Sequence, residues 1–375
     1  ATTNQLHKII TLNQLAVTGA LTLAPNGTGA VTIVNAVNLN LAASTMGGTF
    51  SGTATTGDIS DSGVLTITGA ATFITAQAAQ DIILDQANAF TSHVTMKAGT
   101  GGSLAFNDIT FVDSTDVKLH SSAASAGDLF IDAGTNLAVG GDLSITATNG
   151  HITQGAALAI TGAATFITAA TSKNIILDQN NVFTTTVTMK AGTGGSLAFN
   201  NITFVDSDGV RLHSSAASNG DLFIDAGTNL AVGGDLSITA TNGHITQGAA
   251  LAITGAATFI TAATSKNIIL DQNNVFTTTV TMKAGTGGSL AFNNITFVDS
   301  DGVRLHSSAA SNGDLFIDAG TNLDVDGALI ITATTGNITQ GSELEVGTTS
   351  TFTTSASNGT ITLNDADNTF TGAVA

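Results

Sequence analysis

Short apolar segments alternate with polar turns along most of the chain, and this pattern predicts β-strands. Residues 186–209 are typical: the pieces VTM, LAF and ITFV are separated by AGTGGS and NN and are followed by DSDG. Pieces of three to five β-branched and aromatic residues between turn formers are typical of strands. No segment keeps a helical period over a useful length, and the 42 glycines would destabilise helices. The pattern therefore predicts an all-β protein.

The strand pattern recurs every 93 residues, and residues 158–230 are identical to residues 251–323. One copy divides into lines of 24, 24, 24 and 21 residues, each with about three apolar pieces. Three short strands per coil of about 21–24 residues predict a parallel β-helix, or β-solenoid. Each coil would pair with the next at a spacing of about 4.8 Å. We therefore expect four coils in each repeat.

One continuous solenoid is expected, made of three full repeats and two partial ones. Residues 1–64 are predicted to form diverged amino-terminal coils, and the last segment begins a fourth copy. The full repeats are residues 65–157, 158–250 and 251–343, and the partial fourth repeat is 344–375.

The phenylalanines are predicted to form the core. Of 18 phenylalanines, 15 fall at five positions per repeat, while Phe50 falls outside this scheme. The five positions of the first repeat are Phe73, Phe90, Phe106, Phe111 and Phe130. Columns this regular indicate stacked core side chains, which stabilise a fold through burial and ring contacts.

Charge and composition exclude several classes of function. The chain has 9 Lys and Arg against 27 Asp and Glu, for a net charge of −18, so we expect it to repel nucleic acid. No apolar run reaches 18 residues, so no membrane insertion is expected. The start, ATTNQLHKII, lacks a signal-peptide pattern, which fits either a mature chain or an excerpt of a longer one. The absence of cysteine, common in exported surface proteins, favours an extracellular or cell-surface location.

The phrase GDLSITATNGHITQGAALAITGAATFITA, followed by NIILDQNNVFTTTV, resembles repeats of filamentous-haemagglutinin-like adhesins, which are large exported proteins of Gram-negative bacteria. The G-x-I-T-Q turn of those repeats matches Gly243, Ile245, Thr246 and Gln247. Their L-x-x-x-x-N-x-F turn matches Leu177, Asn181 and Phe183, with one residue fewer than the family spacing. The resemblance implies a right-handed β-helix at the cell surface. The secretion domain of such proteins is not recognisable in residues 1–64.

Histidines recur, but they do not predict an active site. His120, His213 and His306 lie in a K/R-L-H-S motif, and His151 and His244 lie in an N-G-H-I turn. With four coils per repeat, equivalent copies would lie about 19 Å apart, too far to cooperate in one site. No nucleophile elbow or H-E-x-x-H motif frames them. We therefore expect no catalytic residues and no enzyme activity.

Three acidic turns resemble fragments of calcium loops: residues 206–209 and 299–302, both DSDG, and residues 324–327, DVDG. Calcium prefers six to eight oxygen ligands, and two aspartates in a short turn supply too few. Aspartate and glycine are also the ordinary residues of turns. We expect no bound cofactor and no specific metal site, and the alternative is diffuse bridging of acidic rods by divalent ions.

Two further patterns are weighed and discounted. The threonines at 184–186, with Thr161 and Thr165, raise the hypothesis of an ice-binding face, but the required T-x-T pair is interrupted from coil to coil. Residues 99–102, GTGG, are followed by neither Lys-Ser/Thr nor a helix, so they predict a corner turn rather than a phosphate site.

The sequence thus predicts a structural fibre protein used for adhesion or matrix formation. The expected partner is a second copy, joined head to tail through open solenoid edges, or the rest of a longer chain. The first alternative is a module that binds surface glycans or a receptor multivalently. A polysaccharide-cleaving β-helix enzyme is a weaker alternative, because a unique polar cluster is missing.

Overall fold

The computed structural model describes residues 6–99, 107–120, 128–131, 137–192, 201–206, 210–213, 221–224, 230–263, 265–284, 294–300, 303–305, 314–317 and 323–375. These residues form strands and turns and no helix. The chain divides into two compact units. The N-terminal unit is Ala1–Val187 with Ala191–Thr193, and the C-terminal unit is Thr188–Lys190 with Gly194–Ala375.

The strands of the N-terminal unit are β1 (Ile10–Leu15), β2 (Val31–Asn35), β3 (Leu39–Leu41), β4 (Ser44–Met46), β5 (Phe50–Ala54), β6 (Ile59–Asp61), β7 (Leu65–Ile67), β8 (Ala71–Thr75), β9 (Ile82–Phe90), β10 (Val94–Ala98), β11 (Ile109–Asp113), β12 (Val117–Leu119), β13 (Asp128–Ile131), β14 (Leu137–Val139), β15 (Leu143–Ala147), β16 (Ile152–Gln154), β17 (Leu158–Ile160), β18 (Ala164–Thr168) and β19 (Ile175–Phe183). Strand β20 (Val187–Ala191) is divided between the units.

The strands of the C-terminal unit are β21 (Ile202–Asp206), β22 (Val210–His213), β23 (Asp221–Ile224), β24 (Leu230–Val232), β25 (Leu236–Ala240), β26 (Ile245–Gln247), β27 (Leu251–Ile253), β28 (Ala257–Thr261), β29 (Ile268–Phe276), β30 (Val280–Ala284), β31 (Ile295–Asp299), β32 (Val303–Leu305), β33 (Asp314–Ile317), β34 (Leu323–Val325), β35 (Leu329–Ala333), β36 (Ile338–Gln340), β37 (Leu344–Val346), β38 (Ser350–Thr354), β39 (Ile361–Thr362) and β40 (Thr369–Phe370).

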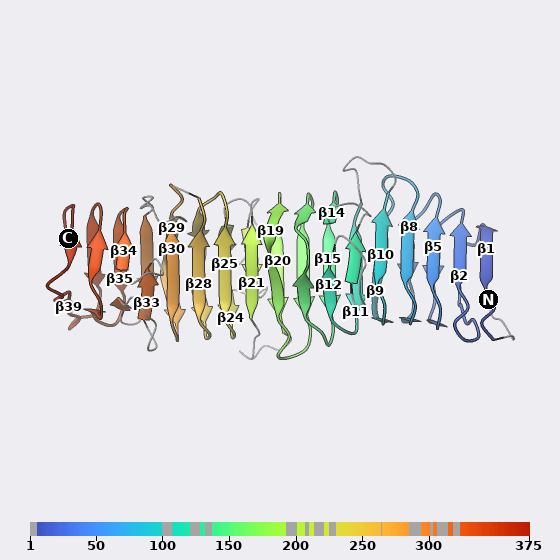
Figure 1. Ribbon diagram of the computed structural model, residues 1–375, viewed down its shortest axis with the longest axis horizontal. Helices are drawn as coiled ribbons and strands as arrows, with labels where there is room; N and C mark the ends of the chain where they lie inside the picture. Colours follow the sequence, from blue (N-terminus) through green and yellow to red (C-terminus); the bar gives the residue numbers. More distant parts are fainter. Residues whose placement is uncertain are drawn as a thin grey trace. The chain divides into compact units, whose positions relative to one another are not determined.

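Strands of successive coils pair in parallel, which confirms the predicted β-solenoid. In the N-terminal unit, β5 pairs with β8 and β8 with β10, so that Phe50, Ala71 and Val94 lie one above the other (Figure 1). Inward and outward residues alternate along these strands, with the inward ones buried. The strands therefore bury one face against the core and hydrogen-bond to neighbouring coils at their edges. The handedness of the coils stays a prediction.

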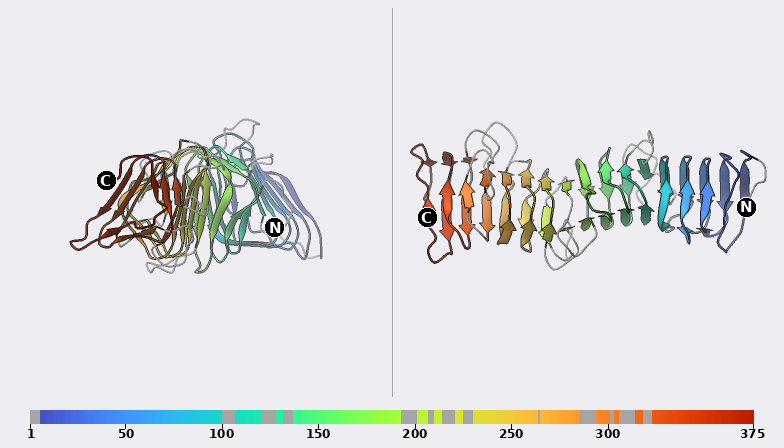
Figure 2. Two further views of the ribbon diagram at one scale, coloured as in Figure 1. Left: turned by 60° about the vertical axis from the view of Figure 1, so that its left-hand side comes forward. Right: turned by 90° about the horizontal axis from the view of Figure 1, so that it is seen from below.

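Three short strands complete one coil, as the sequence predicts. Strands β5, β6 and β7 follow one another around a coil, and each pairs with a different part of the next coil. Strand β9 serves two of these positions: Ile82 pairs with Ile59 of β6, and Phe90 pairs with Ile67 of β7. Both views of Figure 2 show the turns of this unit gathered at the corners between strands.

The expectation of four coils per repeat is wrong. Ala71 and its copy Ala164, 93 residues later, do not lie in the same stack. Ala164 lies in the stack of Ile82, Ile109 and Leu143. These four residues belong to successive coils and are 27, 34 and 21 residues apart in sequence. Ala71 and Ile82 begin consecutive strands of one coil, and three further coils lead from Ile82 to Ala164. A repeat of 93 residues therefore spans three coils plus one strand position. Copies of one residue therefore lie on neighbouring faces, one third of a turn apart.

Unequal coil lengths explain this difference. The coil that runs from Ile109 to Leu143 holds the apolar pieces of β11, β12, β13 and β14, so it uses four pieces where three were expected. The C-terminal unit repeats the arrangement. There Ile268, Ile295, Leu329 and Ser350 are stacked in successive coils and are again 27, 34 and 21 residues apart in sequence.

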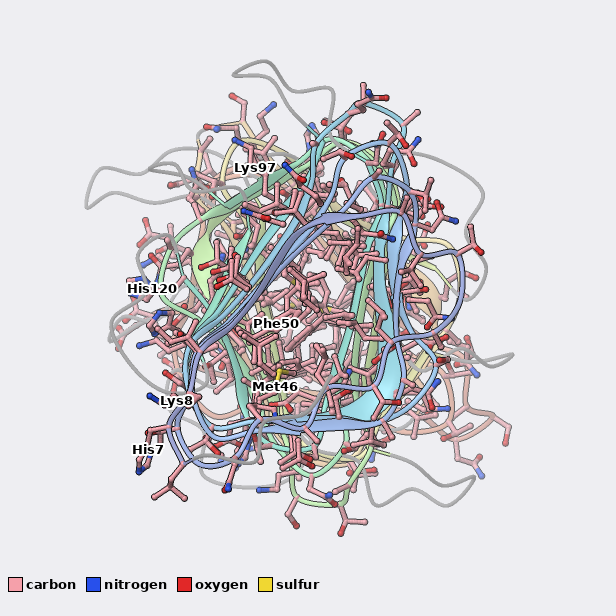
Figure 3. The ribbon with its side chains drawn as sticks, turned by 90° about the vertical axis from the view of Figure 1, so that its right-hand side faces the viewer. His7, Lys8, Met46, Phe50, Lys97 and His120 are labelled. Carbon is pink, nitrogen blue, oxygen red and sulfur yellow. The ribbon has the colours of Figure 1, made fainter. Side chains whose placement is uncertain are left out.

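A row of phenylalanine rings fills the core of the N-terminal unit. The ring centroids of Phe50 and Phe73 are 5.2 Å apart, those of Phe73 and Phe90 6.1 Å, and those of Phe90 and Phe111 5.5 Å. The sequence columns therefore interleave into one row. Figure 3 shows Phe50 inside the ring of strands and the labelled Lys8 outside it.

Phe50 belongs to this row although the repeat scheme left it out. It pairs with Ala71, while the next inward residue of its strand, Gly52, pairs with Phe73. A Cβ atom on Gly52 would lie 2.8 Å from the Phe50 ring, so the glycine makes room for that ring. The large and small residues have thus exchanged places between β5 and β8, and the core remains filled.

Phe73→Ala should lower the free energy of unfolding of the N-terminal unit by about 3–5 kcal/mol, because it removes a fully buried ring and leaves a cavity. Thr72→Ala, on the outward side of the same strand, is the matched control and should change it by less than about 1 kcal/mol. Urea unfolding of both variants measures the difference. Equal effects would show that the ring row does not stabilise the coils.

Candidate functional site: two polar rows between neighbouring coils

A row of buried polar side chains follows one corner of the N-terminal unit through three coils. This inner row consists of Asp61, Asn88 and Asp113, which are 6%, 0% and 2% exposed. Asn88 Nδ2 donates to Asp61 Oδ2 at 2.7 Å, and Asn88 Oδ1 accepts the Leu65 N–H at 2.8 Å. Asp113 Oδ1 accepts the Phe90 N–H at 3.2 Å. These side chains satisfy main-chain donors where the strands turn.

Burial raises the pKa of both carboxyl groups in the inner row. For Asp61, loss of solvent outweighs the hydrogen bonds from Asn88 and from the Asp85 N–H, and the charge of Asp85 raises the pKa further. For Asp113, loss of solvent outweighs the hydrogen bonds from the Thr115 hydroxyl and the Phe90 N–H. Both carboxylates thus cost the fold free energy while they are ionised.

Glutamine replaces Asp61 at the corresponding corners of later copies. Gln154 Nε2 donates to Asn181 Oδ1, which also accepts the Leu158 N–H at 2.8 Å. The same contacts recur in the C-terminal unit, from Gln247 to Asn274 and from Gln340 to Asn368, with the N–H groups of Leu251 and Leu344 each at 2.9 Å. A neutral amide therefore fulfils the structural role of Asp61.

Each of these pairs joins the two turns that resemble the filamentous-haemagglutinin-like repeats. Gln247 ends the G-x-I-T-Q turn, and Asn274 is the copy of Asn181 from the L-x-x-x-x-N-x-F turn. The sequence analysis treated them as separate turns and missed their contact. The signal that could have revealed it is the constant spacing of 27 residues, which equals one coil length.

A second row, the outer row, lies at the other end of these strands and consists of the aspartates just before β6, β9, β11 and β15: Asp58, Asp81, Asp108 and Asp142. In this outer row, each carboxylate accepts the N–H of the next aspartate, at 2.9, 3.1 and 2.8 Å. Asp142 accepts the N–H of Ala163 at 2.7 Å. Loss of solvent raises the pKa of Asp81, and the charges of Asp108 and Asp58 raise it further.

The histidines of the N-G-H-I turns occupy the position of Asp58 in later copies. His151 Nδ1 accepts the Asn174 N–H, and His244 Nδ1 accepts the Asn267 N–H, both at 2.9 Å. They connect neighbouring coils, and no catalytic partner is needed to explain their position. The other group of histidines is described only in part. The ring of His120 lies against Gly155, while the His213 side chain and His306 lie outside the described residues.

The acidic turns are also described only in part. Asp206 and Asp299 are each 3% exposed and end strands, so they point toward the core, whereas residues 207–209 and 301–302 lie outside the described residues. Asp326 is half-buried in the third turn. Within the described ranges, no group of three or more His, Asp or Glu side chains is placed to hold a metal ion.

Hydroxyl side chains form an outward column on the sheet of β1, β2, β5, β8 and β10. The column is uninterrupted in five coils, a feature that the sequence analysis missed, and it consists of Thr11, Thr32, Ser51, Thr72 and Thr95. Two residues further along these strands stand Val34, Thr53, Ile74 and Lys97, so the T-x-T pair is interrupted. Gly99, the first residue of the predicted corner turn, has a φ of +101°, and residues 100–102 lie outside the described residues.

A scan against family models matches the chain to "Repeats of unknown function (DUF5649)" over residues 28–97, 106–190, 199–283 and 312–375. The chain belongs to the DUF5649 repeat family. No curated protein and no solved structure gives a significant match to this DUF5649 chain. Among the described residues, no helix is long and apolar enough to cross a membrane.

Asn88→Leu should lower the free energy of unfolding of the N-terminal unit by at least about 2 kcal/mol, because the Leu65 N–H and Asp61 would lose a buried partner. Gln86→Leu is the matched control, since the Gln86 side chain donates to the neighbouring Asp85 at the surface. Chemical unfolding compares the two variants. A loss of the same size in both would argue against the inner row as a stabilising element.

Proposed function

We propose that this DUF5649 chain is a structural fibre protein, located outside the cell or on its surface, that serves adhesion or matrix formation. One observation carries the proposal: the polar side chains of its corners are used to join one coil to the next. The inner row, the outer row and their copies all hydrogen-bond between coils. Such an arrangement builds length and stiffness. The resemblance to filamentous-haemagglutinin-like repeats and the absence of cysteine support an extracellular place.

The rotation between copies also supports a structural role. Ala71 and Ala164 lie on neighbouring faces, so a side chain that is repeated in sequence is not repeated along one face. A surface that binds a ligand multivalently needs equivalent groups that face it together. The repeats lengthen the solenoid without building such a line.

The proposed partner is a second copy joined head to tail, or further coils of a longer chain. Strand β1 uses one of its two edges to pair with β2, and β40 uses one of its two edges to pair with β37. Ile10 donates to Ala30 of the neighbouring coil, so in a parallel strand the N–H and C=O of Thr11 point to the opposite edge. An edge of this kind can pair with another strand.

Electron microscopy of the 375-residue chain over a concentration series tests the fibre proposal. We expect filaments one solenoid wide that lengthen with concentration. Thr11→Pro should shorten them, because proline removes the outward N–H of β1, whereas Thr11→Val keeps it and should not. Short particles at every concentration, for the parent and both variants, would contradict self-assembly and favour coils supplied by a longer chain.

A second candidate, the binding of surface glycans, is favoured by the hydroxyl column on the sheet of β1 to β10. Five hydroxyl groups in register offer hydrogen-bond donors and acceptors along the solenoid. Retention on a glycan array tests this function. If the column binds, Thr32→Val with Thr72→Val should abolish retention, while Thr165→Val, in a different stack, should leave it unchanged.

A further inference from the structure

The coils of residues 58–142, called the first copy here, carry carboxylates at four corner positions where both later copies have other residues. These are Asp58, just before β6, and Asp61, its last residue, with Asp81 and Asp108 in the next two coils. The second copy has His151, Gln154, Asn174 and Asn201 instead, and the third has His244, Gln247, Asn267 and Asn294. Asn294 Oδ1, for example, accepts the Ala328 N–H at 2.9 Å, as Asp108 Oδ1 accepts the Asp142 N–H. The solenoid therefore does not need the carboxylates for its hydrogen bonds.

Stacking brings the like charges of the first copy close together. Asp81 lies between Asp58 and Asp108, one coil away on each side. Like charges in neighbouring coils repel one another, and they do so more strongly where water is partly excluded. The ionised outer row therefore opposes the coil stacking that its hydrogen bonds support.

The groups around these carboxylates offer little compensation. Asp61 faces the Asn88 amide and the Asp85 carboxylate on β9. Asp81 faces Asp58 and Asp108, and Asp113 contacts the Thr115 hydroxyl and main-chain N–H groups. The contacts of both rows are thus amides, hydroxyls and other carboxylates.

We propose that the coils of residues 58–142 form an acid-strengthened segment, in which protonation of Asp61, Asp81 and Asp113 tightens the stacking of coils. In the later copies Asn267 Oδ1 and Asn294 Oδ1 accept the equivalent N–H groups without a carboxylate. This pH response does not depend on the proposed fibre function.

The direction of the effect in the first copy follows from proton binding. Asp61, Asp81 and Asp113 have a pKa above the ordinary value of 3.8 in the folded chain, so the fold binds protons more readily than the unfolded chain does. Their stabilising contribution is fully present below the unfolded pKa and is lost as the pH rises through the folded pKa. Stability gained in this segment thus appears on acidification from neutral pH.

Hydrogen exchange of the full chain at about pH 8 and about pH 4, corrected for intrinsic rates, tests the proposal. Residues 76–98 are unique in sequence and report the first copy, whereas residues 169–183 and 262–276 are identical and report both later copies in one peptide. We expect protection in 76–98 to rise in acid, because the raised pKa of Asp61, Asp81 and Asp113 makes the folded chain bind protons more readily. Protection in the copy peptide, where Asn174 and Asn267 stand in place of Asp81, should rise less.

A variant that takes the residues of the copies is the matched control. Asp61→Gln with Asp81→Asn and Asp108→Asn should raise protection of residues 76–98 at about pH 8 and flatten its response to acid. Added salt should protect the parent near the outer row at about pH 8, through screening, and should leave the variant unchanged. The proposal is overturned if the parent gains no protection in acid, or if the variant keeps the parent's full response.

A reciprocal variant keeps the test decisive if the first one does not fold. Asn267→Asp with Asn294→Asp rebuilds part of the outer row in the C-terminal unit and gives residues 262–276 a mass distinct from residues 169–183. Protection in 262–276 should then fall at about pH 8 and recover in acid, relative to 169–183. Equal behaviour of the two peptides would overturn the proposal.

Discussion

The structure depends on one constraint: the backbone polar groups of each strand must be paired by the coils before and after it. Hydrogen bonds such as those from Val31 to Thr49 and from Phe50 to Ala70 run between coils, so no coil is satisfied alone. Core side chains must then match the coils on either side. The exchange of large and small residues between Phe50 and Gly52 on β5 and Ala71 and Phe73 on β8 shows how this matching is kept when the sequence varies.

The same constraint governs the polar residues of the corners. Where a strand turns, some N–H groups lose their strand partner, and a side chain from the neighbouring coil must replace it. Asn88 and its copies Asn181 and Asn274 do this from inside the core, while Asp81, Asn267 and their neighbours do it at the surface. Because an amide, a carboxylate and a neutral imidazole can each accept the bond, the charge of a corner is free to change between copies. This freedom is what separates the first copy from the later ones.

A repeat of three coils and one strand position links the fold to its proposed use. In the N-terminal unit the second copy starts one face further around the solenoid than the first, as Ala71 and Ala164 show. Copying the sequence therefore adds length while distributing its exposed side chains over different faces. Such a design suits a fibre better than a one-sided binding surface.

The sequence by itself determined the class of the fold, its repeat and the residues that face the core. Short β-branched and aromatic pieces between turn formers leave few alternatives to stacked parallel strands, and their alternation separates inward residues such as Phe73 from outward ones such as Thr72. Only the tertiary structure decided how many coils make a repeat, because this number depends on how the pieces of β11 to β14 share one long coil. It also decided that Gln247 meets Asn274, that Phe50 joins the ring row and that four aspartates line one corner. Those contacts join residues one coil apart, and the length of a coil is fixed only when its turns have folded.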